Sequence, residues 1–208
     1  MPRDVILNRV RLALGDPGKP PPPPQVRFDK KSFADPVGVF LDTLNRLVVN
    51  TYRAPSAAEA RQYAERVIDG RLAVAADSPY LASLGIPAIP GVEIARGEAR
   101  ELCATAAVGI TSAEYGLADT GTMVMLSSPE QPRLVSLLPP VHLAIMPASR
   151  VLSGLDEFLE MVPKPMENSS SLVFITGGSR TADIEMILVR GVHGPGVVHV
   201  VVVEEGQK

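Results

Sequence analysis

The sequence is poor in the residues that build metal centres and disulfides. Among its 208 residues, Cys103 is the only cysteine, and there are three histidines. A single thiol cannot form an internal disulfide, and zinc cages or iron–sulfur clusters need several thiolates or a histidine cluster. The three histidines have no metal-ligand spacing. We therefore expect no metal or other cofactor in this chain, and we interpret Cys103, in the apolar helical stretch 101–107, as a buried structural thiol.

Aromatic residues and positive charge are also scarce. Tryptophan is absent, aromatics make up 4% of the chain, and the formal net charge is −3. Nucleic-acid binding requires a basic face for the phosphates, and single-stranded binding adds aromatic platforms for the bases. The composition offers neither, so we expect no nucleic-acid partner.

Long hydrophobic runs are missing as well. The longest apolar run, 134–146, contains Pro139, Pro140 and His142 and is too short to span a bilayer. The sequence opens Met1-Pro-Arg-Asp4 and shows no hydrophobic signal core. These features predict a cytoplasmic protein without a membrane span.

The length allows one well-buried core. We expect residues 1–24 to form an N-terminal helix, over 4–14, and a proline-rich linker, followed by a single α/β domain over 25–208. Consecutive prolines cannot continue a helix and favour an extended chain. The linker is either a stiff spacer behind a docking helix or a ligand for a proline-binding module.

The rest of the chain alternates between helical and strand patterns. Apolar residues at helical spacing, with Ser56-Ala-Ala-Glu59 as a capping box, predict helices over 36–49, 56–68, 155–162 and 182–190, and a helical turn over 79–84. Short apolar runs predict strands over 72–76, 122–127, 141–146, 172–176 and 197–203. Apolar strands separated by helices are typical of a mostly parallel sheet covered on both faces. Ligands of such sheets bind beyond the carboxyl ends of the strands.

The first candidate binding segment is Ala118-Asp-Thr-Gly-Thr122. Gly121 allows a close approach of the backbone to a ligand, and the hydroxyls of Thr120 and Thr122 with successive amides can form a small anion-binding nest. The alternative is an ordinary turn in which the polar side chains bond their own backbone.

The second candidate segment is Gly177-Gly-Ser-Arg-Thr-Ala-Asp-Ile-Glu185. Thr181 is a good N-cap for the predicted helix, whose backbone amides, together with Gly178, Ser179 and Arg180, would bind a phosphate or carboxylate. Asp183 and Glu185 would weaken this attraction, because they already complement the helix dipole. The segment is neither a P-loop nor a nucleophile elbow.

The third candidate segment is Gly191-Val-His-Gly-Pro-Gly196. His193, flanked by Gly194, should be accessible and could exchange a proton near neutral pH, or it could be a turn histidine bonded to carbonyls. We interpret His142 and His199, inside apolar strands, as core histidines with satisfied hydrogen bonds. A Ser179–His193–Asp183 triad has no oxyanion-hole context to support it.

Arg133 adds a possible cation to these loops. It stands just before an apolar stretch that we interpret as a buried strand. From there it could reach the Thr120–Thr122 loop and neutralise an anion, or it could form a surface ion pair of little energetic value.

Four runs together resemble the lactate-utilization protein C family, whose shared module is the LUD domain. These runs are Ala118-Asp-Thr-Gly-Thr122, Arg133-Leu-Val-Ser-Leu-Leu-Pro139, Gly178-Ser-Arg-Thr-Ala-Asp-Ile-Glu185 and Gly191-Val-His-Gly-Pro195. The resemblance covers roughly 105–203 closely and the N-terminal half more loosely. Gly178 departs from the family pattern, which commonly has proline there, but the change removes no polar group.

The resemblance implies a three-layer α/β/α fold, similar to the sugar-phosphate isomerase and CoA-transferase group. It also implies a role in oxidising L-lactate to pyruvate beside partner proteins that carry iron–sulfur clusters. On this hypothesis the chain is a non-redox subunit. It would bind a small carboxylate through Arg180 and Arg133, oriented by Thr120, Thr122 and Ser179. The catalytic residues stay unknown, with His193, Arg180 and Asp183 as candidates.

Two other functions fit the same residues. One is a free-standing enzyme on a phosphorylated or CoA-linked metabolite, although a fold analogy is a weak basis for a function. The other is a metabolite-sensing regulator without chemistry. The ligand that the protein binds would distinguish the three hypotheses.

Overall fold

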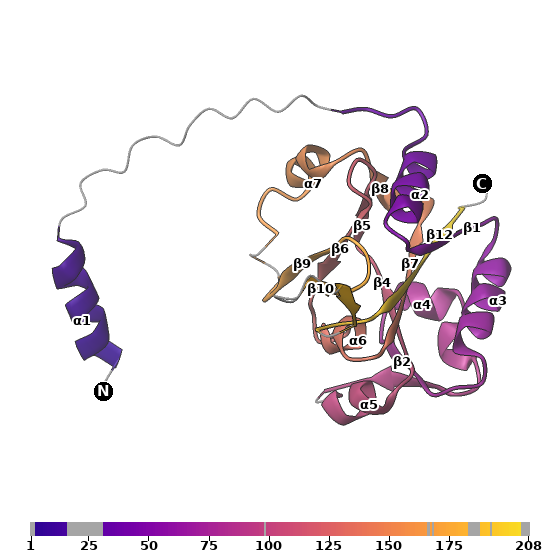
Figure 1. Ribbon diagram of the computed structural model, residues 1–208, viewed down its shortest axis with the longest axis horizontal. Helices are drawn as coiled ribbons and strands as arrows, with labels where there is room; N and C mark the ends of the chain where they lie inside the picture. Colours follow the sequence, from indigo (N-terminus) through magenta and orange to yellow (C-terminus); the bar gives the residue numbers. More distant parts are fainter. Residues whose placement is uncertain are drawn as a thin grey trace.

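The computed structural model describes residues 3–15, 31–97, 99–165, 167, 169–182, 188–191 and 193–204 (Figure 1). The core of the molecule is a six-stranded sheet in which every pair of neighbours is parallel. In spatial order its strands are β1 (Asn50–Ala54), β12 (Val197–Val203), β7 (Val141–Pro147), β4 (Val108–Ser112), β2 (Ala73–Ala76) and β3 (Val92–Ala95). The expected parallel sheet is therefore confirmed, and it also contains β4 and two short edge strands, β1 and β3, that are not among the predicted strands.

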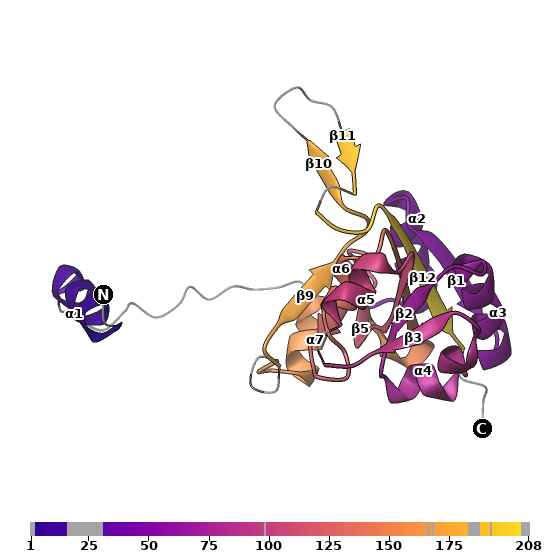
Figure 2. The ribbon, with the colours of Figure 1, turned by 90° about the horizontal axis from the view of Figure 1, so that it is seen from below.

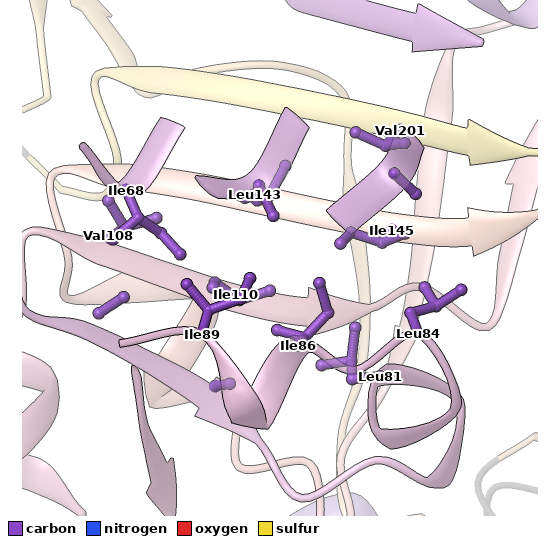
Figure 3. Close-up of a cluster of buried hydrophobic side chains, with 14 of the residues drawn as sticks. Ile68, Leu81, Leu84, Ile86, Ile89, Val108, Ile110, Leu143, Ile145 and Val201 are labelled. Atoms are coloured by element: carbon purple, nitrogen blue, oxygen red, sulfur yellow. The ribbon is translucent and has the colours of Figure 1, made fainter. Parts of the chain in front are cut away.

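One face of this sheet is covered by α3 (Ala57–Ile68) and α4 (Pro79–Ser83). The Ser56 side chain caps α3 by accepting a hydrogen bond from the amide of Glu59. The reciprocal bond of a capping box is replaced, because the carboxylate of Glu59 accepts the hydroxyl of Tyr52 on β1 instead. Alternate residues of the central strands, among them Ile110, Leu143 and Val201, pack against these helices (Figure 3). Burying such side chains contributes about 2 kcal/mol each.

The opposite face is covered by α2 (Pro36–Arg46), α5 (Arg100–Thr105) and α6 (Leu134–Leu137). The sheet thus lies between two covering layers, as a three-layer α/β/α fold requires. Cys103 on α5 is fully buried, as expected, and its burial raises the pKa of its thiol. Helix α6 approaches β4 so closely that a Cβ on Gly109 would lie 1.9 Å from the carbonyl oxygen of Val135. Only glycine fits there.

A second, four-stranded sheet packs beside α2 on this face. Its order is β8 (Val151–Leu152), β5 (Tyr115–Leu117), β6 (Thr122–Leu126) and β9 (Leu172–Ile175), and β6 is antiparallel to both of its neighbours. Helix α7 (Leu155–Met161) buries Phe158 against it. The strands predicted at 122–127 and 172–176 are confirmed, but they belong to this sheet and not to the parallel one.

The helix predicted over 182–190 is wrong at its described ends, 182 and 188–190, while 183–187 lie outside the described residues. The chain forms an antiparallel pair of short strands instead, β10 (Arg180–Ala182) and β11 (Leu188–Arg190), which project from the body of the molecule (Figure 2). Thr181 lies inside β10 and is not an N-cap. Apolar residues at 184, 187 and 188 match a helical face, but the cross-strand hydrogen bonds between 180–182 and 188–190 satisfy the backbone in another way.

The strand expected directly after Arg133 does not begin there. Arg133 precedes the short helix α6, and β7 begins only at Val141, after Pro139 and Pro140. A proline lacks the amide hydrogen that a central strand donates to its neighbour, so the strand cannot extend back through these two residues.

The N-terminal helix is confirmed as α1 (Arg3–Leu14), and none of its residues is buried. The proline-rich linker at 16–24 lies outside the described residues. No helix in the described ranges is long and apolar enough to cross a membrane.

His142 lies on the central strand β7 and is fully buried. Its Nε2 atom lies 2.8 Å from the Thr111 hydroxyl, whereas Nδ1 has no hydrogen-bond partner. The interpretation of a fully satisfied core histidine therefore holds for only one of the two ring nitrogens. Burial lowers the pKa of His142 from 6.5 to about 4, because a charged imidazolium would lose its hydration there.

This buried histidine predicts an acid-sensitive fold. The unfolded chain takes up the proton first, so stability is lost as pH falls from the unfolded pKa towards the folded one. Between pH 7 and pH 5 the free energy of unfolding should fall by about 2 kcal/mol more in the wild type than in His142→Gln. Urea unfolding at both pH values measures this difference. The exposed His193→Gln variant should retain the wild-type dependence, and an equal loss in His142→Gln would contradict the assignment.

Candidate functional site

The first candidate segment forms the turn between β5 and β6, where three threonine hydroxyls make a chain. The hydroxyl of Thr122 lies 2.8 Å from that of Thr120 and 2.8 Å from that of Thr176, at the end of β9. Thr122 is buried, whereas Thr120 and Thr176 are exposed. Thr176, which directly precedes the second candidate segment, is thus joined to the first segment by hydroxyls, with Thr120 and Thr176 open to solvent.

Gly121 is buried in this turn and faces α2. Its φ of 64° lies in the left-handed region, and a Cβ there would lie 3.2 Å from the amide nitrogen of Leu44. The Thr43 hydroxyl also donates to the carbonyl of Ala118. Glycine is therefore needed at 121 for the close packing of the turn on α2.

The second and third candidate segments lie against each other. The amide of Ser179 donates to the carbonyl of Pro195, the amide of Gly191 donates to the carbonyl of Ser179, and the amide of His193 donates to the Ser179 hydroxyl at 3.3 Å. His193 is exposed, as expected. Gly194 lies beside Ser179, while a Cβ on Gly178 would be 2.9 Å from the carbonyl oxygen of Gly196. The structure thus brings Gly178, Ser179, His193 and Gly194 together.

These loops lie at the opposite edge of the parallel sheet from the one expected. The amides of Gly196 and Val197 donate to the carbonyl of Pro140, which places them at the amino ends of β12 and β7. The expectation of a carboxyl-end position was wrong, because β6 and β9 run antiparallel in the second sheet and reverse the direction of the chain. Arg180 and Thr181 lie on β10, and Asp183, and with it part of the unsupported Ser179–His193–Asp183 triad, lies outside the described residues.

Arg133 lies at the far end of β6 from Thr122. It is exposed and borders an open groove whose lining is rich in serine. The residues of this groove, which we call the serine groove, are Ser127, Ser128, Pro132, Arg133, Ser170 and Ser171. In the part of the chain that the structure describes, Arg133 forms no ion pair. The structure therefore places Arg133 with a different set of hydroxyls from the predicted Thr120 and Thr122.

The carboxyl edge of the parallel sheet carries a polar network that the sequence reasoning missed. The Ser112 hydroxyl lies 2.8 Å from both the Ser78 hydroxyl and the side-chain oxygen of Gln131. A hydroxyl has one proton, so if Ser112 donates to Gln131, it accepts from Ser78. The side-chain nitrogen of Gln131 then donates to Glu114 at 3.3 Å. The sequence did contain a signal for this network, because Ser78 and Ser112 each lie two residues after the last apolar residue of a strand.

This network occupies the point where the sheet changes direction. From β2 the chain passes outward to β3, whereas from β4 it passes the other way to β7 and β12. Such a reversal leaves a crevice beyond the two strands, which is where ligands of open parallel sheets bind. Here the side chains of Ser112 and Gln131 are buried in it. The amide of Asp77 also donates to the carbonyl of Glu130, which ties the loop over the crevice.

Glu114 is the titratable member of the network. Burial raises the pKa of its carboxyl group, against the opposing effects of the Arg150 charge and the hydrogen bond from Gln131. Arg150 also donates to the Tyr115 hydroxyl at 3.0 Å and lies over that ring, 5.1 Å from its centroid. His199 on β12 is half-buried, with Nδ1 2.9 Å from the Tyr63 hydroxyl. In the described ranges no three acidic, histidine or cysteine side chains gather as a metal site would require.

Comparison with known proteins agrees with this architecture. A crystal structure of a DUF162 family protein from Deinococcus radiodurans superposes with a TM-score of 0.64 at 19% identity, covering 84% of this chain and 99% of that one. Residues 37–203 match the LUD domain. The protein is thus a three-layer α/β/α protein, and it belongs to the LUD domain family.

Curated relatives share part of this domain. Lactate utilization protein C of Bacillus licheniformis is 38% identical over 102 residues, 47% of this chain and 42% of the relative. The Bacillus subtilis protein of that name is 44% identical over 92 residues, 42% of this chain and 38% of the relative. The matched region therefore spans less than half the length of these two relatives.

The raised pKa of Glu114 predicts a stability change with the opposite sign to that of His142. The folded protein holds the Glu114 proton more tightly than the unfolded chain, so ionisation costs stability as pH rises through the range of the carboxyl group. From pH 4 to pH 7, the free energy of unfolding of the wild type should therefore fall relative to that of Glu114→Gln, whose amide oxygen can still accept from Gln131. Chemical unfolding at the two pH values measures this. Glu130, which is exposed and precedes Gln131, provides the matched control Glu130→Gln. Identical pH profiles for the two variants would contradict a raised pKa of Glu114.

Proposed function

We propose that this protein takes part in lactate utilization, as a non-redox component that binds a small carboxylate such as lactate or pyruvate. Membership of the LUD domain family supports the proposal, as do the relatives named lactate utilization protein C. The run that begins at Arg133 and the loops around Thr120 and Ser179 carry the resemblance. Among these segments, the run that begins at Arg133 has an exposed cation in the described residues, and that cation lines the serine groove.

The serine groove supplies the chemistry that a small carboxylate needs. Its arginine has a planar guanidinium that can pair with both carboxylate oxygens, and no acidic group of the described residues competes for it. Serine hydroxyls can accept or donate hydrogen bonds, which suits the hydroxyl of lactate as well as the keto oxygen of pyruvate. The observation that carries the proposal is this free cation among hydroxyls.

Redox chemistry would come from partner proteins. One buried cysteine cannot hold an iron–sulfur cluster, because such clusters are ligated by several thiolates. We therefore propose that the chain works beside iron–sulfur lactate-utilization proteins, which would transfer the electrons. The exposed His193 is available as a contact for such partners or for the substrate.

Ligand binding tests the carboxylate site. A ligand at 100 times its dissociation constant stabilises the folded protein by about 2.7 kcal/mol, which corresponds to a rise of about 5 to 10 °C in Tm for a chain of this size. Lactate or pyruvate should produce this rise in the wild type, and Arg133→Ala should abolish it. Arg96→Ala is the matched control, since its ion pair with Asp77 is exposed and of little energetic value.

The competing functions give different results in the same assay. A response to sugar phosphates or CoA, but not to lactate or pyruvate, would favour a free-standing enzyme on such a metabolite. A response to lactate without any effect on lactate oxidation would favour a metabolite sensor. An Arg180→Ala variant, measured in parallel, tests the alternative assignment of the anion to the loop at 177–181.

Reconstitution tests the role in lactate oxidation. Lactate-dependent dye reduction by the iron–sulfur partner proteins should require this chain, and Arg133→Ala should lower it at least about tenfold, the loss expected when a charged hydrogen bond to a ligand is removed. Adding Arg96→Ala protein should restore the wild-type rate. If the partners reduce the dye equally well without the chain, the proposed participation in oxidation is wrong.

A further inference from the structure

Helix α1 has an apolar surface that nothing covers among the described residues. Ile6 is 49% exposed, Val10 48% and Leu14 69%, and these three side chains recur every four residues along one stripe. Arg9 and Arg11 flank the stripe on its two sides. The helix carries three arginines and one aspartate, so its surface is positively charged.

A helix of this kind depends on a partner surface. Isolated helices shorter than about 12 to 15 residues are marginal in water, and α1 has 12 residues. Most of the stability of such a helix comes from packing its apolar face. The exposed stripe therefore indicates that α1 docks.

The domain offers a complementary surface on α7 and β9, which pack against each other through Phe158 of α7 and Leu172 and Phe174 of β9. Leu155 and Leu159, one helical turn apart, are each 43% exposed, and Phe174 on β9 is 44% exposed. The Phe174 ring packs edge-on against Phe158, with centroids 6.3 Å apart, so the two elements form one surface. We call Leu155, Leu159, Met161 and Phe174 the α7–β9 patch.

Charge and strand pairing also favour this surface. Helix α7 carries Asp156, Glu157 and Glu160 and no basic residue, which is complementary to the arginines of α1. Strand β9 is an edge strand of the four-stranded sheet. Exposed apolar edges of this kind are usually covered by a helix or loop, because they otherwise promote aggregation.

We propose that α1 docks on the α7–β9 patch of its own chain. Residues 15–35 connect α1 to α2, and 21 residues can span about 70 Å when extended, against about 40 Å across a domain of this size. A tethered segment has an effective concentration in the millimolar range, which favours the same chain over a second copy at micromolar protein. This proposal is independent of the proposed function.

Disulfide trapping in the full-length protein tests the docking. Ala13→Cys, on the α1 stripe, is combined with Leu159→Cys on the patch, and the reference pair combines Ala13→Cys with Gln62→Cys, an exposed position of α3 on the opposite face of the sheet. Cys103 does not compete, because it is fully buried. Under a mild oxidant, the patch pair should form an intramolecular disulfide at least about tenfold faster than the reference pair, because docking raises the local concentration.

A second variant separates docking from chance collisions. Ile6→Asp with Val10→Asp, added to the patch pair, should reduce the rate to that of the reference pair. The domain should still unfold cooperatively, since neither side chain belongs to its core. Equal rates for the patch and reference pairs would overturn the proposal. So would covalent dimers as the main product at micromolar protein, since these would assign the patch to a second copy.

Discussion

The close contact between α6 and β4 at Gly109 determines where the second half of the chain can lie. Because residue 109 has no side chain, the carbonyl of Val135 reaches the surface of the sheet, and α6 lies flat across β4. The loop before α6 is thereby held over the carboxyl ends of β2 and β4. After α6, the two prolines lead directly into β7 at the other edge of the sheet.

This arrangement gives the two edges of the sheet different character. At the carboxyl edge, Gln131 and Ser112 occupy the crevice where an open parallel sheet would usually bind its ligand. Glu114 contacts Gln131 there and interacts with the charge of Arg150. At the amino edge, the glycine-rich loops meet beside the starts of β7 and β12, and Gly191 and His193 are exposed there. The serine groove adjoins the carboxyl-edge network, because the amide of Gln131 donates to the hydroxyl of Ser128, and it extends to the residues that lead into β9.

Two buried ionisable groups link the fold to pH in opposite directions. His142 is neutral when folded and loses stability to acid, whereas the buried position of Glu114 favours its protonated form. His142 lies on the central strand β7, and Glu114 follows the end of its neighbour β4.

The sequence by itself determined the apolar strands predicted at 72–76, 141–146 and 197–203, the capped helix after Ser56 and the buried thiol of Cys103. Each depends on local patterns: the spacing of apolar residues or a side chain that caps its own helix. The family resemblance rested on short runs, and those runs do lie in a LUD domain. Tertiary structure alone decided the strand pairing. The segment 182–190 fits a helix by spacing, but its ends pair as strands, because cross-strand hydrogen bonds can outweigh a local preference. Long-range pairing placed β6 and β9 in a second sheet, moved the predicted binding loops to the amino edge, and brought Arg133 to a set of serines that no sequence spacing connects.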